Sequence, residues 1–237
     1  MNALLSVPLK SVLRFIGAFG DFIYPPYCLT CEAQLERRNE LLCKHCFDEL
    51  PRIPENYNIR AELEQKLQQE LHVSRILSLW EFRDDVQLLI HYFKYNHHRI
   101  IGNVLAQNLV KQFGKLEIMK RAEIIVPVPL HKRRLHKRGY NQSELISEGI
   151  SQLINKPVVK GALRRIINTK SQTRLNAIER KKNVEKAFTI LKQDSIIGRT
   201  VLLVDDVITT GSTMNACAEQ LRSAGVKEVF ALSAAKA

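Results

Sequence analysis

The sequence predicts an α/β fold: a parallel sheet flanked by helices, joined to a small N-terminal module with four cysteines. Short apolar runs at residues 124–126, 201–204 and 228–233 alternate with segments of helical character, which is typical of a parallel sheet. Four of the five cysteines lie near the N-terminus. A chain of 237 residues is long enough for one medium domain and a smaller appendage. We therefore predict two domains, 1–56 and 57–237.

The cysteine cluster reads Cys28-x2-Cys31 and, eleven residues later, Cys43-x2-Cys46. Two paired thiolates at this spacing complete a tetrahedral zinc site. The segment has few large apolar residues, so bound metal would supply much of its stability. Disulfides are the alternative, but we find no secretory signal in the first 27 residues and expect a reducing cytosol. Cys217 stands apart, and we expect it to be a small buried hydrophobe.

The next segments have recognisable periodicities. Pro51–Asn58 is interpreted as a linker because it has two prolines and no period. We then expect a helix over Arg60–His72, a strand over Ile76–Phe82, a helix over Asp84–Tyr95 and another helix to about Phe113. Four aromatic residues in this region offer either core packing or a surface for stacking a base, and we expect core packing: Trp80, Phe82, Tyr92 and Tyr95.

From residue 123 the pattern becomes that of alternating strands and helices. A buried strand at 124–126 ends in Pro127-Val128-Pro129, and basic residues follow before a helix from Asn141 to about Ile154. Gly139 permits an unusual backbone angle, and Asn141 is a suitable helix cap. We expect a short extended piece at Pro157-Val158. The chain then continues with a basic segment, a strand at 201–204, a helix to Ala224 and a last strand at 228–233.

The most informative segment is VLLVDDVITTGST, residues 201–213. Its apolar strand is followed by Asp205 and Asp206, which can accept hydrogen bonds from paired ribose hydroxyls or hold a magnesium ion. A turn rich in hydroxyl groups then opens a helix, and this combination is a natural phosphate cradle. The turn consists of Thr209, Thr210, Gly211, Ser212 and Thr213. Simple capping of a helix by Asp206 or Ser212 is the alternative, but it requires far fewer of these residues.

Positive charge is concentrated in the centre of the chain. The formal net charge is +12, and residues 130–182 contain 14 Lys or Arg against three acids. This concentration suggests a polyanionic partner, although a solvated basic surface is the alternative. Two runs supply candidate residues for pyrophosphate or DNA: Lys132, Arg133, Arg134, Lys137 and Arg138 in the first, and Arg174 and Arg180 in the second. The second run, 170–188, is expected to be a loop that closes over a bound sugar phosphate.

These motifs together resemble known families. The 201–213 segment resembles the 5-phosphoribosyl-1-pyrophosphate (PRPP) signature of type I phosphoribosyltransferases. By that resemblance Asp205 and Asp206 face the ribose 2′- and 3′-hydroxyls, and Thr209–Thr213 surround the 5′-phosphate. With the cysteine pairs, VPVP…KRGYNQSEL and SQTRL…ERKKNVEKAF, the chain resembles the ComF/GntX family. That resemblance implies a zinc ribbon fused to a phosphoribosyltransferase-like domain and a role in natural competence or use of external DNA.

The function predicted from these features is that of a DNA-uptake protein. It would bind single-stranded DNA through the basic loops and PRPP, with magnesium, at the ribose-phosphate site. An active phosphoribosyltransferase and a non-catalytic PRPP-binding adaptor are the alternatives. We also expect structural zinc and a cytoplasmic location. Other DNA-uptake proteins at the inner face of the membrane are expected partners. No segment is apolar for the ~20 residues that a membrane span requires, although residues 11–24 are apolar enough to contact a membrane surface.

Overall fold

The computed structural model describes residues 27–36, 40–95, 98–167 and 187–237. The chain divides into two compact units, Met1–Leu50 and Pro51–Ala237. The expected lid segment, with Arg174 and Arg180, and the apolar residues 11–24 lie outside the described residues. Within the described residues, no helix is long and apolar enough to cross a membrane.

The smaller unit consists of two cysteine-bearing turns and a short helix. An antiparallel bridge joins Tyr27 and Gln34 around the first cysteine pair. Helix α2 (Lys44–Asp48) carries the second pair at its start, and the Sγ atom of Cys43 accepts a hydrogen bond from the N–H of Cys46 at 3.5 Å. The N–H of Leu29 donates to the carbonyl of Leu41, which holds the two halves together.

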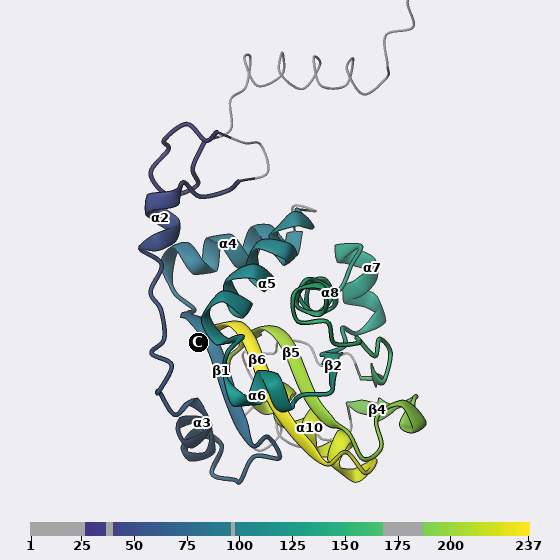
Figure 1. Cartoon of the computed structure of the whole chain (residues 1–237). Helices are drawn as coiled ribbons and strands as arrows, with labels where there is room; N and C mark the ends of the chain where they lie inside the picture. The colour runs from purple at the N-terminus through teal and green to yellow at the C-terminus, as the bar shows by residue number, and fades with distance from the viewer. Residues whose placement is uncertain (1–26, 37–39, 96–97, 168–186) are drawn as a thin grey trace, which may run out of the picture. The chain divides into compact units, whose positions relative to one another are not determined.

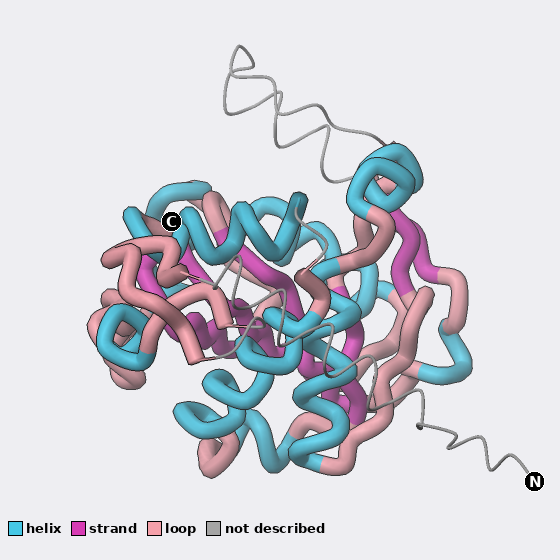
Figure 2. Tube along the Cα trace, turned by 90° about the horizontal axis from the view of Figure 1, so that it is seen from above, coloured by secondary structure: helices cyan, strands magenta, loops and turns pink. Residues whose placement is uncertain are grey.

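A parallel four-stranded sheet forms the centre of the larger unit (Figure 1). Its order is β1 (Arg75–Glu81), β6 (Glu228–Lys236), β5 (Thr200–Ile208) and β2 (Ile124–Pro127). Helices α5 (Ile100–Phe113) and α8 (Gln142–Ile154) pack on one face. Helices α3 (Ile59–Leu67) and α10 (Ser212–Ser223) cover the other, so that helices surround the strands in Figure 2. The predicted fold class is confirmed.

Alternation along the strands explains this layering. In β5, Val201 and Leu203 join Val229 of β6 in one core with Cys217 and Leu221 of α10. Cys217 is fully buried, as expected. Because consecutive strand residues face opposite sides, the intervening buried residues of β5 face the helices on the other side of the sheet. A strand buried on both faces reads as a continuous apolar run, which is why this strand is recognisable in the sequence.

The remaining elements are short, and some differ from expectation. Helix α4 (Asp84–Tyr95) has the predicted bounds, whereas α6 (Glu117–Arg121) and α7 (Lys132–Arg138) were not expected. Strands β3 (Leu163–Arg165) and β4 (Phe188–Ile190) form an antiparallel ribbon, and η1 (Gln193–Ser195) is a single 3-10 turn. The predicted extended piece at Pro157 is confirmed: Val158 pairs with Ile125 of β2 in parallel.

The segment expected to be a linker is partly sheet. The N–H of Ile53 donates to the carbonyl of Leu79 at 3.0 Å, and the N–H of Glu81 donates to the carbonyl of Pro51 at 2.9 Å. Arg52 forms an antiparallel bridge with Trp80 of β1, and the side chain of Ile53 is buried. These residues therefore cover the outer edge of β1. The prolines that suggested a linker are compatible with an edge position, where a missing N–H does not interrupt the sheet.

Candidate ribose-phosphate site and zinc ribbon

The two adjacent acids lie where β5 extends past its neighbour β2. Strand β2 ends at Pro127, which is paired with Val204, whereas the pairing of β5 with β6 continues to Ile208. The acids are thus inside the strand and not after its end, which corrects the expectation. Asp205 is the first residue of β5 after its pairing with β2 ends. Ligands of open α/β sheets bind at this carboxyl edge of the strands.

Asp205 is held by hydrogen bonds from two elements. The hydroxyl of Ser143, in the first turn of α8, donates to Oδ1 of Asp205 at 2.8 Å, and the N–H of Asp206 donates to the same oxygen at 2.9 Å. Burial and then the charge of Asp206 nevertheless raise the pKa of Asp205 to about 7. Lys94 acts in the opposite direction. This carboxyl group therefore exchanges its proton near neutrality.

Asp206 faces a lysine from α4. Its Oδ2 atom lies 3.0 Å from Nζ of Lys94, and the two side chains are 11% and 19% exposed. Its Oδ1 atom accepts a hydrogen bond from the N–H of Val207 at 2.8 Å. The two neighbouring carboxylates thus have different partners, Ser143 for Asp205 and Lys94 for Asp206. Because each carboxylate has its own partner, the two acids can lie side by side although they are partly buried.

The turn after β5 has the geometry expected of an anion cradle. Gly211 has φ of +80° and precedes the first residue of α10, and the Oγ1 atom of Thr210 accepts a hydrogen bond from the N–H of Ser212 at 3.4 Å. The positive φ favours glycine, and a Cβ atom at Gly211 would also lie 2.9 Å from Cδ1 of Leu63 in α3. Thr209 and Thr210 are exposed, and Ser212 and Thr213 are half-buried. The Oγ atoms of Thr210 and Ser212 are 2.9 Å apart. The turn therefore presents hydroxyl groups beside the first N–H groups of helix α10.

The first basic run forms helix α7 and is not the loop we expected. His131 accepts a hydrogen bond from the N–H of Arg133 at the start of the helix, and Gly139, with φ of +76°, ends it. Gly139 thus adopts the predicted unusual angle, and Asn141 caps α8 as predicted. No residue of α7 is buried. Arg134 and Arg138 are half-buried, whereas Lys132, Arg133 and Lys137 are exposed.

One further cation, Arg165 of β3, was missed in the sequence. Its side chain is 8% exposed, and its guanidinium lies 5.3 Å from the centre of the Phe188 ring. Burial and then Arg134 lower the pKa of Arg165, whereas Cys217 and Asp205 raise it. Arg165 therefore interacts electrostatically with Arg134 of α7 and with Asp205. Ser143, Lys94 and Arg165 come from three separate elements, and no spacing motif connects them to the acids.

The four cysteines come together in the smaller unit. The Sγ atoms of Cys28, Cys31, Cys43 and Cys46 all lie within 4.8 Å of one another, and none forms a disulfide. The N–H of Cys43 donates to Sγ of Cys28 at 3.3 Å. Burial raises the pKa of Cys28, but N–H donors from the surrounding turns outweigh it and lower the pKa to about 6. Four cysteine sulfur atoms this close together fit a tetrahedral zinc ion, which they would bind as thiolates.

Comparison with known proteins first defines the class of protein. The model of the phosphoribosyl transferase domain matches residues 102–236, and that of the double zinc ribbon domain matches residues 19–57. Together with the parallel sheet and the cysteine cluster, these matches define a phosphoribosyltransferase-domain protein with an N-terminal zinc ribbon, and they support a structural zinc site.

Relatives then define the family. Competence protein F of Haemophilus influenzae is 31% identical over 221 residues, which cover 89% of this chain and 96% of that protein. DNA utilization protein YhgH of Escherichia coli K12 is 28% identical, with 85% and 86% covered. Competence protein ComFC of Bacillus subtilis is 23% identical, with 87% and 92% covered. The chain belongs to the ComF/GntX family.

Proposed function

We propose that this chain acts in competence or DNA utilisation, binding PRPP at the edge of β5 and single-stranded DNA on the basic surface of α7. The observation that carries the proposal is the position of Asp205 and Asp206 beyond the end of β2, two residues before the Thr209–Thr213 turn. The names of the relatives, competence protein and DNA utilization protein, support the biological role.

The ribose-phosphate part of the proposal follows from the chemistry of the edge. The carboxylates of Asp205 and Asp206 would accept hydrogen bonds from the ribose hydroxyls, and the turn before α10 would bind the 5′-phosphate. Magnesium prefers carboxylate and phosphate oxygens, so it would enter with the pyrophosphate group of the ligand. The buried Arg165 interacts electrostatically with Asp205 and with Arg134 of α7, so these two arginines suit the pyrophosphate.

The DNA part rests on α7. Helix α7 carries five Lys or Arg residues and buries no side chain, so it concentrates positive charge at the surface. The phosphate groups of a DNA strand would pair with this positive charge, and their neutralisation would release counterions from the DNA. We place this activity in the cytoplasm, beside other DNA-uptake proteins at the inner face of the membrane. Glycosyl transfer from PRPP is the second candidate function, because the same edge would hold the reacting ribose.

Calorimetry tests the proposal with PRPP–Mg²⁺ and a single-stranded oligonucleotide, each alone and then in competition. We expect both to bind wild-type protein. The pair Asp205→Asn and Asp206→Asn should abolish PRPP binding and leave DNA binding intact. The pair Lys137→Gln and Arg138→Gln should weaken DNA binding and reduce its dependence on salt, by roughly 0.7 in log–log slope for each DNA phosphate that the protein no longer neutralises.

Two results would overturn parts of this proposal. Absence of PRPP binding would remove the ribose-phosphate site, and DNA binding that is absent or insensitive to salt would remove the basic surface as a DNA site. Release of pyrophosphate from PRPP, lost in the Asp205→Asn and Asp206→Asn protein, would identify the transferase alternative. Binding of PRPP without turnover, together with a protein partner that is lost on Cys28→Ser, would identify the adaptor.

A further inference from the structure

Tyr95 is an exposed aromatic residue at the last position of α4. Its side chain is 45% exposed, whereas Phe93, two residues earlier, is fully buried. The sequence led us to expect core packing for the aromatic residues of this region. That expectation is confirmed for Trp80, which is fully buried, and is wrong for Tyr95. The ring of His91, one turn earlier on α4, lies 4.8 Å from the Tyr95 ring and supports it on the helix.

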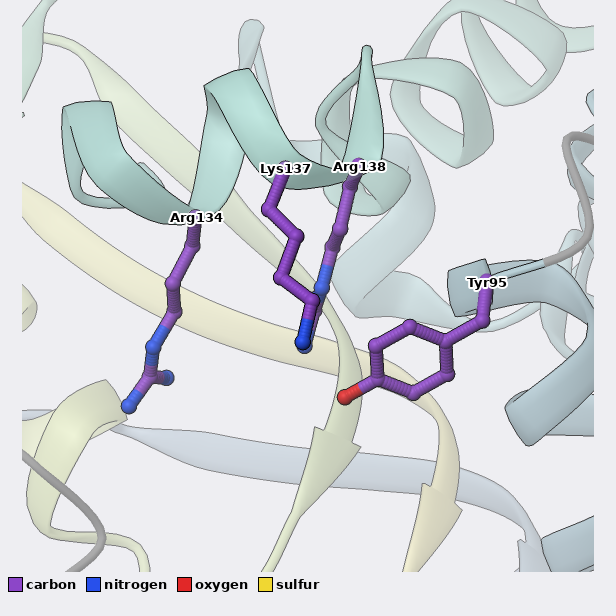
Figure 3. A pocket seen from close by; sticks show the side chains of 4 residues that line it. All are labelled: Tyr95, Arg134, Lys137 and Arg138. Carbon is purple, nitrogen blue, oxygen red and sulfur yellow. The ribbon is translucent and has the colours of Figure 1, made fainter.

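A pocket of about 330 Å³ lies beside this ring and is lined by Tyr95, Arg134, Lys137 and Arg138 (Figure 3). The three basic residues are spaced i, i+3 and i+4 in α7, so they share one face of the helix. Figure 3 shows Lys137 and Arg138 extending from this helix toward Tyr95. Nζ of Lys137 lies 5.8 Å and Cζ of Arg138 5.3 Å from the centre of the ring. All four lining side chains are thus cationic or aromatic.

Two properties of the pocket define the chemistry of its ligand. Three cations with no acid in the lining favour an anion, and Arg138 is already oriented by a hydrogen bond of 2.9 Å to Oε1 of Gln142. A half-exposed ring next to them favours a flat group with a π face. A nucleotide carries both an anionic phosphate and a flat base. Small-molecule sites begin at about 300 Å³, so the volume suits a single nucleotide unit.

We propose that Tyr95 is a stacking platform for one unpaired base of single-stranded DNA, with Lys137 and Arg138 binding the phosphates that flank it. The inference rests on the proposed DNA-binding function and adds a base contact to it. Single strands are favoured over duplex because a paired base already has neighbours on both faces. Stacking on an aromatic ring tolerates any sequence, since every base has a π face. The site therefore predicts binding that depends on the presence of bases but discriminates little among them.

The test compares a short thymidine oligomer with an abasic oligomer of the same length and charge. Binding of each is measured for the wild type, Tyr95→Phe and Tyr95→Ala by fluorescence anisotropy. Loss of the ring should weaken binding of the thymidine oligomer by roughly 5- to 150-fold, whereas Tyr95→Phe, which keeps the ring, should stay near wild type. On the abasic oligomer, all three proteins should bind equally. Thymidine monophosphate should bind much more weakly than the oligomer, because it offers only one phosphate.

Tyr57→Ala is the matched control. Tyr57 is 47% exposed and also lies near a lysine, Lys236, whose Nζ is 5.8 Å from the ring centre. That lysine is neutralised by Glu62, so the surroundings of Tyr57 do not favour an anion. Tyr57→Ala should therefore bind both oligomers as the wild type does.

Four outcomes would overturn the inference. Equal loss of both oligomers in Tyr95→Ala would mean that the ring only positions the cations. Equal binding by Tyr95→Ala and wild type would leave DNA binding to α7 intact but remove the platform. If the wild type binds neither oligomer, the proposed DNA function itself fails. Tight binding of thymidine monophosphate, comparable with that of the oligomer, would instead identify a site for free nucleotides.

Discussion

The ammonium group of Lys94 lies 3.0 Å from Oδ2 of Asp206, and both side chains are mostly buried. Lys94 comes from α4, more than a hundred residues before the acid it contacts. This ion pair joins the helix that carries Tyr95 to the strand that carries the candidate ribose contacts. Because the pair is shielded from solvent, its loss should reduce the stability of the protein more than the loss of a surface ion pair would.

Replacing Lys94 by methionine should destabilise the protein by about 1 to 3 kcal/mol, because the charge of Asp206 would stay partly buried without its partner. In urea unfolding, the double variant Lys94→Met with Asp206→Asn should lose less than the sum of the two single variants. Lys66→Met is the control. Lys66 pairs with Glu62 at 2.7 Å but is 53% exposed, so its loss should cost under about 0.5 kcal/mol. Strict additivity of the Lys94 and Asp206 variants would show that the two groups are not coupled.

Gly211→Ala should destabilise the protein and weaken PRPP binding. Alanine at φ of +80° costs about 1 to 2 kcal/mol from backbone strain alone. Its Cβ atom would also lie 2.9 Å from Cδ1 of Leu63, so this fully buried side chain would have to shift. Gly198→Ala isolates the first effect, because Gly198 has φ of +70° with no atom within 4 Å of the added Cβ. Urea unfolding should therefore show a larger loss at Gly211 than at Gly198. Equal losses would argue against close packing of α3 on the turn.

Sequence patterns predicted the elements that carry an apolar signal. The continuous apolar run of β5 and the helical spacing in α4 identified both elements, and α4 was predicted with its observed bounds. Helix α7 was missed because it buries no side chain and therefore has no apolar stripe to detect. The extension of β5 through Asp205 was missed because its pairing with β6, and not its own composition, makes it a strand.

The candidate site could be predicted only where its residues are close together in the sequence. The acids and the turn are consecutive in the sequence, so their chemistry could be read directly. Ser143, Lys94 and Arg165 reach them only through the packing of α8, α4 and β3, which no local pattern encodes. The exposure of Tyr95 was equally hidden, because an aromatic residue at helical spacing is compatible with either the core or the surface.

The pKa of Asp205, about 7 in the folded protein against an ordinary value of 3.8, predicts a pH dependence of stability. Between these two values the folded state keeps a proton that the unfolded state releases. The free energy of unfolding should therefore fall as the pH rises from about 4 to about 7 and be independent of this group above pH 7. Asp205→Asn cannot ionise and should lack this contribution. The variant should gain stability relative to the wild type as the pH rises through the window.

Urea unfolding of both proteins at several pH values measures that difference directly, because contributions from all other groups cancel to first order. A constant difference between wild type and Asp205→Asn from pH 4 to pH 8 would show that Asp205 is ionised throughout. Such a result would mean that Ser143 and Lys94 outweigh burial at this carboxyl group.

Removal of zinc should unfold the smaller unit and leave the sheet of the larger unit folded. The four Sγ atoms lie within 4.8 Å of one another, and only Cys28, Leu35, Leu42, Cys46 and Leu50 are buried apolar side chains among the described residues up to Leu50. So small a core cannot hold the turns without metal. We expect about one zinc ion per chain by elemental analysis, and none after Cys28→Ser or Cys46→Ser.

Cys217→Ala is the control for that experiment, because Cys217 is buried in the sheet core of the larger unit and is not part of the cluster. It should keep its zinc while losing some stability from the smaller side chain. Limited proteolysis after chelation should then cut within residues 27–50 and spare the larger unit. Protection of residues 27–50 in metal-free protein would mean that the cysteines are not what holds this unit together.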